Sequence, residues 1–254
     1  MIHTENPPGF IVRTEAQKAA FDNGYRIERG VTNGWMRYGS TTAKGDIWLA
    51  ALSPSGPWFL SLQHPEVATE LGSSPLPSAT VPGIATFSFD KLADLYTALD
   101  RVYRLGVSLP DVPLEQFRSA TKNMPQTTEA ERLAVCRVGQ TLFRQALLDY
   151  WNGRCPMTGI TEEPLLRASH IVAWADCEND DLRLDVHNGL LLSALWDAIF
   201  DCGLISFGDG GEVLLSDQLS ACALAALNTQ DRVLDGLTDA HRVNLARHRA
   251  RHRF

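Results

Sequence analysis

Four side chains between residues 153 and 207 are of the types that hydrolytic metal sites use. His170 interrupts an apolar run, Asn188 lies in a turn, and Asp197 follows Asn188 by nine residues in a helix-like segment. Asp201 lies four residues after Asp197, so the two carboxylates share one helical face. A lone histidine in an apolar run is more often a packed core residue, but these neighbours favour a hydrolytic site.

The elements that must position these side chains can be predicted from the flanking pattern. Two β-like runs, 165–172 and 190–192, precede a helix-like run at 194–201. Upstream, a long helix is expected to begin after Thr128 and to end at Gly153, because an N-cap residue and a glycine mark its ends. The predicted unit is therefore a β-hairpin followed by a helix, with a long helix before it.

Three phrases of the sequence extend this pattern beyond single residues. They are GQTLFRQALLDYWNGRCPMTGI at 139–160, LLRASHIVAWA at 165–175 and HNGLLLSALWDAIFDCGLISF at 187–207. Together with the order of histidine, asparagine and a polar helix residue, they resemble the His-Asn-His (HNH) endonuclease family, in particular its bacterial restriction-type branch. The resemblance covers about residues 130–254, including the basic C-terminal end.

The resemblance implies a ββα-metal fold, a DNA substrate and one divalent cation. It implies that His170 is the general base, since a neutral imidazole can accept a proton near neutral pH. Asn188 would either orient this imidazole or brace the loop that carries it. Asp197 and Asp201 are the implied metal ligands, and their carboxylates suit Mg²⁺ or Mn²⁺. The cation would neutralise charge developing on the scissile phosphate and the leaving oxygen.

The chain departs from the family pattern at two positions. Asp197 stands where the third motif letter is usually histidine, and Ser169 stands where many relatives have a metal-binding Asp or His. Asp197 would hold the metal alone or with help from Asp201, and the alternative for Asp201 is a hydrogen bond at the helix end. His187, beside Asn188, is expected at the surface.

Arginines are the candidates for DNA contacts, although the net charge of −7 argues against nonspecific binding by the whole molecule. The last fourteen residues lack carboxylates and include Arg247, Arg249 and Arg251. This end either grips the DNA backbone or forms a solvated helical face. Arg144, on the long helix, either binds phosphate or makes a structural salt bridge.

Residues 1–107 are predicted to form a separate small α+β domain with an antiparallel sheet, so that the whole chain is of the α+β class. Aromatic and aliphatic runs alternate there with Gly, Ser, Thr and Pro clusters, as in short strands joined by turns. The expected strands are 34–38, 46–52, 58–62 and 86–89, and the expected helices are 14–22, 65–71 and one that begins at Asp90.

The role of this N-terminal half is open. Trp35, Trp48 and Trp58 could line a pocket for a flipped base, but sheet core is the stronger interpretation. Asp and Glu outnumber Lys and Arg in this half, which favours ligand or partner sensing over direct DNA contact. Residues 108–128 contain three prolines and no sustained periodicity, so we expect a linker there, followed by the HNH domain at 129–254.

Composition excludes several other classes of protein. No run approaches the roughly 18 apolar residues of a membrane span, and the N-terminus lacks the build of a secretory signal. A cytoplasmic location is therefore expected. Five widely spaced cysteines argue against a disulfide framework and against a structural zinc site. We expect reduced, mostly buried thiols.

These observations favour a metal-dependent DNA endonuclease of a restriction or defence system, whose N-terminal domain selects the target, for example modified DNA. One alternative is a catalytically weak or inactive HNH-fold module that binds DNA or regulates a partner. Another is a nuclease switched on by a ligand or partner at the N-terminal domain. Since double-strand cleavage by a single-site nuclease usually needs two active sites, a homodimer is also expected.

Overall fold

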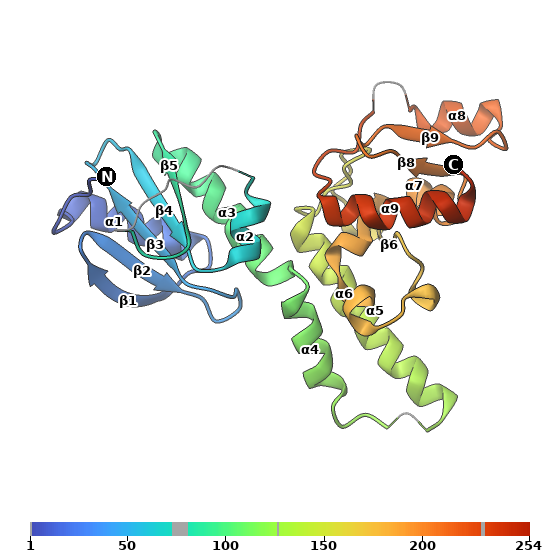
Figure 1. Ribbon diagram of the computed structural model, residues 1–254, viewed down its shortest axis with the longest axis horizontal. Helices are drawn as coiled ribbons and strands as arrows, with labels where there is room; N and C mark the ends of the chain where they lie inside the picture. The colour runs from blue at the N-terminus through green and yellow to red at the C-terminus, as the bar shows by residue number, and fades with distance from the viewer. Residues whose placement is uncertain (1, 73–80, 126, 230–231) are drawn as a thin grey trace. The chain divides into compact units, whose positions relative to one another are not determined.

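The computed structural model describes residues 2–72, 81–125, 127–229 and 232–254. The chain divides into two compact units, residues 1–107 and residues 108–254 (Figure 1). Both units combine helices with antiparallel strands, which confirms the predicted α+β class. No helix in the described part of the chain is long and apolar enough to cross a membrane.

The first unit is built on a five-stranded sheet whose strand order follows the sequence, from β1 to β5 (Figure 1). All neighbouring strands are antiparallel. A tight turn joins β3 to β4, where the Gly56 N–H donates to the Ser53 carbonyl at 3.0 Å. The strands are β1 (Ile27–Thr32), β2 (Trp35–Gly39), β3 (Ile47–Ala51), β4 (Trp58–Leu62) and β5 (Ala85–Phe89), and the helices are α1 (Phe10–Asp22), α2 (Pro65–Glu70) and α3 (Leu92–Ser108).

The four strands predicted in this half are present as β2 to β5, and two features differ from expectation. β1 was missed because almost all of its residues are exposed, so it lacks the apolar alternation that marks a half-buried strand. It is an edge strand with a bulge between Glu28 and Val31. In addition, α1 begins at Phe10 rather than at residue 14.

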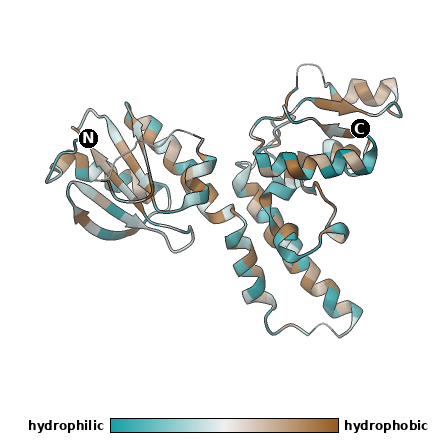
Figure 2. Cartoon of the chain, viewed as in Figure 1, coloured by the Kyte–Doolittle hydropathy of each residue, from teal (hydrophilic) through white to brown (hydrophobic). Residues whose placement is uncertain are grey.

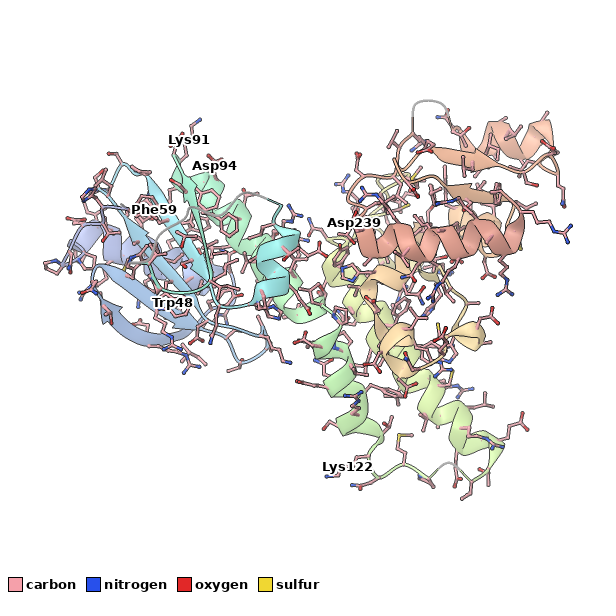
Figure 3. The ribbon with its side chains drawn as sticks, viewed as in Figure 1. Trp48, Phe59, Lys91, Asp94, Lys122 and Asp239 are labelled. Atoms are coloured by element: carbon pink, nitrogen blue, oxygen red, sulfur yellow. The ribbon has the colours of Figure 1, made fainter. Side chains whose placement is uncertain are left out.

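The tryptophans of this unit belong to the sheet and cannot line one pocket together. Successive residues of a strand point to opposite faces, and the registers place Trp35 and Trp48 on one face and Trp58 on the other. Trp35 and Trp58 are almost fully buried. Trp48 lies partly buried near Phe59 (Figure 3). The sheet-core interpretation is therefore correct for Trp35 and Trp58.

The second unit contains mostly helices and two short antiparallel hairpins, β6–β7 and β8–β9. Hydrophilic residues dominate its last helix, α9, whereas α8 is largely apolar (Figure 2). The helices are α4 (Asp111–Thr121), α5 (Glu129–Tyr150), α6 (Asp180–Leu184), α7 (Ala194–Asp201), α8 (Ala221–Leu227) and α9 (Asp239–His252), with short 3₁₀ turns η1 (Glu163–Leu165), η2 (Trp174–Asp176) and η3 (Val186–Asn188). The strands are β6 (Leu166–His170), β7 (Gly189–Ser193), β8 (Ile205–Phe207) and β9 (Val213–Leu215).

Residues 108–128 were expected to form an irregular linker. This prediction is wrong, because the segment contains α4. The prolines suggested a break in structure, but Pro113 lies in the first turn of α4, where a missing N–H breaks no intrahelical bond. Val112 and Phe117 are buried, and α4 packs against α5. This segment is therefore part of the second unit.

The long helix predicted before the site is α5, and its start follows the sequence signal. The Thr128 side chain accepts from the Glu131 N–H, and Glu131 bonds back to the Thr128 N–H in a capping box. At the other end, Gly153 has φ +58°, the left-handed conformation that glycine tolerates best. This helix supplies the platform on which the β6–β7 hairpin lies.

The cysteines of the chain are free thiols. Cys155 and Cys177 are buried and Cys136 is half-buried, but Cys202 and Cys222 are exposed. The expectation that most thiols are buried is therefore wrong for these two positions, which lie at the end of α7 and in α8.

Candidate active site

The predicted hairpin and helix form one continuous unit in the second half of the chain. β6 pairs with β7 in antiparallel register, with His170 opposite Gly189 and Leu166 opposite Ser193. α7 begins immediately after β7, and packs back on both strands. His170 thus stands at the end of one strand and Asp197 in the first turn of the helix, within one ββα unit.

The hairpin directs adjacent residues of β6 to opposite faces. The His170 ring stacks on Phe143 of α5, with ring centroids 3.8 Å apart and planes 18° apart. Its neighbour Ser169 donates a side-chain hydrogen bond to the Asp197 carboxylate on the α7 side. The imidazole and the carboxylate therefore flank the C-terminal end of β6 rather than contact each other directly.

Close packing of the hairpin on α5 depends on a residue without a side chain at the start of β7. A Cβ atom at Gly189 would lie 2.5 Å from the Phe143 Cζ and 2.8 Å from the nearest Leu147 methyl carbon, distances that van der Waals radii do not permit. Glycine at this position lets the strand approach the helix closely. This approach sets the position of the His170 ring, because Gly189 is the cross-strand partner of His170.

The hydrogen bond of the His170 ring fixes its tautomer. Its Nε2 lies 3.0 Å from the Arg183 carbonyl oxygen; a carbonyl only accepts, so Nε2 carries the proton and Nδ1 keeps the lone pair in the neutral ring. Burial lowers the pKa of His170, and the bond to Arg183 raises it by less. The ring is therefore neutral at physiological pH, with Nδ1 able to accept a proton.

Asn188 is fully buried and braces the loop that follows His170. Its Oδ1 accepts from the Val172 N–H at 2.8 Å, and its Nδ2 donates to the carbonyls of Val172 at 3.2 Å and Leu182 at 3.1 Å. A further contact joins Nδ2 to the Cys177 Sγ at 3.4 Å. These bonds favour the loop-bracing alternative, since none of them reaches the imidazole.

Asp197 and Asp201 lie one turn apart on α7, as their spacing predicts. Burial raises the pKa of Asp197, and the nearby Asp201 raises it further, while the Ser169 hydroxyl and Arg167 lower it. An ionised pair of this kind is destabilised by repulsion, which a bound divalent cation would relieve. Asp201 itself is exposed, so it remains open to solvent.

The carboxylates fit a cation that takes part of its coordination from water and phosphate. Mg²⁺ is commonly bound through one or two carboxylates together with substrate oxygens. Across the described ranges, no third His, Cys, Asp or Glu ligand atom joins Asp197 and Asp201 within 4.8 Å. The protein would thus provide at most these two carboxylates at this position.

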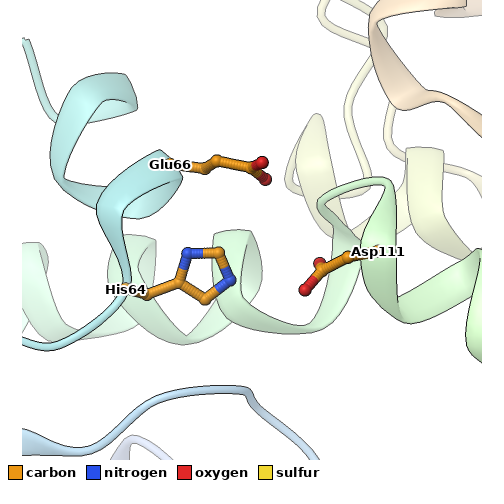
Figure 4. A group of neighbouring side chains, drawn as sticks. All are labelled: His64, Glu66 and Asp111. Atoms are coloured by element: carbon orange, nitrogen blue, oxygen red, sulfur yellow. The ribbon is translucent and has the colours of Figure 1, made fainter.

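A different group of potential ligands comprises His64, Glu66 and Asp111 (Figure 4). His64 and Glu66 lie at the start of α2 in the first unit, and Asp111 is the first residue of α4 in the second unit. Because the group takes its members from both units, we assign no metal site to it.

Three of the four candidate DNA-binding arginines make structural contacts. Arg144 donates to the Leu166 carbonyl at 2.9 Å and the Glu163 carbonyl at 3.0 Å, and its guanidinium lies 3.5 Å from the Glu163 carboxylate. It therefore fastens the start of β6, as the salt-bridge alternative expected. The remaining contacts are those of Arg249 with the Phe207 carbonyl and the Asp209 carboxylate, both at 2.7 Å, and of Arg251 with Asp176.

Arg247 differs from these three residues. It is exposed on α9, and no hydrogen bond or ion pair to it occurs among the residues that the structure describes. Burial raises the pKa of the Cys177 thiol, in the loop after His170, and the positive charge of Arg247 opposes this rise. Of the four arginines predicted to contact DNA, Arg247 is the one whose side chain has no hydrogen bond or ion pair among the described residues.

The expectation that His187 is a surface residue is wrong. Its side chain is only 13% exposed, with Nδ1 2.8 Å from the Asp185 carboxylate. The ring meets Tyr150 and His241 edge to face, and the His187 carbonyl accepts from Asn244 of α9 at 3.0 Å. The sequence could not reveal this burial because α9 lies more than fifty residues further along the chain.

Three residues near His170 were not predicted as part of the site. Phe143 stacks on the imidazole, the Trp174 ring lies perpendicular to it with ring centroids 5.5 Å apart, and Arg183 supplies the carbonyl acceptor. Phe143 and Trp174 lie in the sequence segments that resemble HNH nucleases. That resemblance was the signal from which their place at the site could have been predicted. Arg183 lies in a short acidic stretch, in which no sequence signal marked it as part of the site.

Comparison with known proteins agrees with this geometry. The family model described as HNH endonuclease matches residues 155–208. The matched segment contains β6, β7 and α7, and with them His170, Asn188 and both carboxylates. It does not include Phe143 or α9. None of the curated proteins matches the chain.

Proposed function

We propose that this protein is a metal-dependent DNA endonuclease that hydrolyses phosphodiester bonds at the β6–α7 site. The observation that carries the proposal is the geometry around the end of β6. The Arg183 carbonyl accepts from His170 Nε2, which leaves Nδ1 able to accept a proton. The neighbouring Ser169 bonds to Asp197 of α7 on the other side of the strand. The match of residues 155–208 to HNH endonucleases supports the same activity. The restriction-type branch is part of the proposal.

In the proposed reaction, His170 acts as general base. Nδ1 removes a proton from a water molecule while the water oxygen bonds to phosphorus and the bond from phosphorus to the leaving oxygen breaks. The carbonyl of Arg183 stabilises the N–H of the resulting imidazolium. Burial favours the return of His170 to the neutral form by release of the proton to solvent, and the leaving oxygen takes up a proton from solvent. Asn188 keeps the loop in place during this step.

Asp197, with help from Asp201, would hold one Mg²⁺ or Mn²⁺ ion. The ion would supply positive charge for the scissile phosphate and the leaving oxygen. Ser169 does not substitute for a metal-binding Asp or His here; its hydroxyl instead orients the Asp197 carboxylate. Arg247, which lies beside the loop after His170, would pair with a phosphate of the DNA backbone.

The proposal includes a wider biological assignment. The protein would serve in a bacterial-type restriction or defence system in the cytoplasm, and the N-terminal unit, residues 1–107, would select the DNA target. Cutting of both strands would involve a homodimer, because each chain offers a single site. These points rest on the resemblance and on the presence of a separate N-terminal unit.

The test is DNA cleavage by the purified chain and by His170→Ala. Plasmid and genomic DNA, methylated and unmethylated, are incubated with Mg²⁺, Mn²⁺ or EDTA. The proposal expects metal-dependent cutting that His170→Ala lowers by at least about 10²-fold, the usual contribution of a general base. His3→Ala, at an exposed histidine of the first unit, is the matched control.

Two outcomes would reject the proposal. Cutting that persists in His170→Ala would show that His170 is not the general base. Absence of cutting on every substrate, with DNA binding retained, would favour the inactive HNH-fold module as the function of the chain.

A second candidate function is a nuclease switched by a small ligand, and a cavity in the first unit favours it. The cavity has a volume of about 100 Å³ and lies between α1 and the bulge of β1. Arg13, Gln17, Glu28 and the buried Tyr38 line it. Its size is below that of sites for drug-sized molecules, so the ligand would be small and polar. Ligand-dependent cutting that Arg13→Ala abolishes would establish this function.

A further inference from the structure

Arg183 makes more contacts around the loop after His170 than a surface cation needs. Its Nε donates to the Trp174 carbonyl at 3.2 Å and its Nη2 to the Cys177 carbonyl at 2.8 Å. Its Nη1 pairs with the Asp180 carboxylate at 2.9 Å. The guanidinium therefore ties together three points of the loop, although about a quarter of the side chain remains exposed.

The same residue supplies the hydrogen-bond acceptor of the proposed base. The Arg183 carbonyl receives the Nε2 proton of His170 at 3.0 Å. Trp174, whose carbonyl the guanidinium holds, also places its ring perpendicular to the imidazole, with ring centroids 5.5 Å apart. The guanidinium lies 5.9 Å from the centre of the Trp174 ring. The side chain of Arg183 thus fixes both groups that contact His170 from the loop.

We propose that the side chain of Arg183 is a positioning residue for His170. By fastening the loop, it holds its own carbonyl at the Nε2 of the imidazole, and this bond keeps the lone pair on Nδ1. The catalytic consequence rests on the function proposed above, but the effect on the tautomer of His170 does not. Arg183 touches neither the phosphate nor the water in this proposal.

The physical reason is geometric. A backbone carbonyl can select a tautomer only if the chain that carries it is held within hydrogen-bond distance, and thirteen residues separate His170 from Arg183. The Arg183 N–H donates to the Asn179 carbonyl at 3.2 Å within α6, and Asn188 secures the Leu182 carbonyl. These bonds shape the short helix, whereas the guanidinium of Arg183 also joins it to the Trp174 and Cys177 carbonyls of the preceding loop. The planar guanidinium makes several hydrogen bonds in fixed directions, which an ammonium group cannot reproduce.

The experiment measures the histidine ring nitrogens of the free protein by ¹⁵N NMR, without DNA, with His170 assigned from a His170→Gln spectrum. The wild type should show a protonated Nε2 and an unprotonated Nδ1 at neutral pH. Arg183→Met should give a mixture of the two tautomers and lower the cleavage rate by about 10²-fold, as expected for a misplaced catalytic group. Arg183→Lys should recover this rate only in part.

Arg144→Met is the matched control, because Arg144 also donates to backbone carbonyls but at the opposite end of β6. It should lower thermal stability without changing the ring-nitrogen signals of His170. If Arg183→Met does not fold, the tautomer of His170 is measured in Arg183→Lys instead. An unchanged tautomer in a folded Arg183 variant would overturn the inference, even if cleavage fell. If Arg183→Met loses the Nε2-protonated tautomer of His170 but the wild-type protein cuts no DNA, the inference about Arg183 stands and the proposed function is rejected.

Discussion

The phenyl ring of Phe143 lies flat against the imidazole of His170, with ring centroids 3.8 Å apart. Phe143 belongs to α5, outside the segment that matches the HNH family, and it comes 27 residues before His170. The proposed base is therefore supported from one side by the long helix and held from the other by the loop that carries Arg183. Neither support is among the residues that would react.

Replacing Phe143 with Leu should weaken the first of these supports. Leucine fills most of the volume but removes the stacked face, so the imidazole gains freedom; we expect a cleavage rate about tenfold lower and a free energy of unfolding lower by about 1–2 kcal/mol. Phe59→Leu, in the core of the first unit, is the control for a comparable loss of packing. Equal effects of the two substitutions on cleavage would contradict the assigned role.

Asn188→Asp should destabilise the protein through its buried amide. The variant keeps an acceptor for the Val172 N–H but loses the Nδ2 donor to the Val172 and Leu182 carbonyls and buries a charge. The free energy of unfolding, measured with urea, should fall by about 2–4 kcal/mol. Asn179→Asp is the control, since Asn179 caps α6 at the surface and Asp caps helices equally well. A change below about 0.5 kcal/mol at Asn188 would contradict this account.

Asp197→Asn should separate metal binding from stability. Because burial and Asp201 raise the pKa of Asp197 in the folded protein, its ionised form costs stability as pH rises through that pKa. In EDTA at pH 7 the variant should therefore melt at a higher temperature than the wild type. Saturating Mn²⁺, at 100 times its Kd, should stabilise the wild type by about 2.7 kcal/mol and leave the variant unchanged.

Asp217→Asn, at an exposed position, is the control for this experiment and should respond to Mn²⁺ as the wild type does. A metal response that survives Asp197→Asn would place the ion elsewhere. A lower melting temperature of this variant in EDTA would show that the Ser169 bond outweighs the effect of burial.

Arg247→Ala and Arg249→Ala should differ although the residues lie two positions apart on α9. Removal of Arg247 should weaken DNA binding and reduce the slope of log K against log salt by about 1, with unchanged stability. Removal of Arg249, which bonds to Phe207 and Asp209, should lower the free energy of unfolding by about 1–3 kcal/mol and change the salt slope less. Identical salt slopes for both variants would contradict the assignment.

Acid should destabilise the second unit through its buried histidines. Burial lowers the pKa of His241 to about 3 and that of His248 to about 4. The unfolded chain binds protons near pH 6.5, so stability is lost as pH falls from about 6.5 toward these values. The slope for fully buried His241 would reach about 1.4 kcal/mol per pH unit.

His241→Gln should flatten this dependence, because glutamine preserves the capping box with Thr238 and does not titrate. Urea unfolding between pH 4 and 7 measures the effect. His3→Gln, at an exposed histidine, should leave the slope unchanged, and an equal slope in wild type and His241→Gln would refute the account.

Local signals in the sequence predicted much of the fold. The N-cap residue Thr128 predicted the start of α5 correctly, because the preference for an N-cap residue is a local property. The aromatic runs predicted β2 to β4, because alternation and turn residues are local properties. By contrast β1, which has almost no buried residues, and α4, whose Pro113 is tolerated in the first turn, carried misleading local signals.

For the candidate site, the sequence by itself determined the order of His170, Asn188 and the two carboxylates. It also determined that the two carboxylates share one face of a helix, because the period of a helix decides which neighbours share a face. Only the tertiary structure decided that Phe143 stacks on the imidazole, that the Arg183 carbonyl selects its tautomer, and that Asn188 braces the loop. It also separated Arg247 from arginines already bonded within the fold. These facts depend on contacts between residues distant in the chain, which packing establishes and local periodicity does not encode.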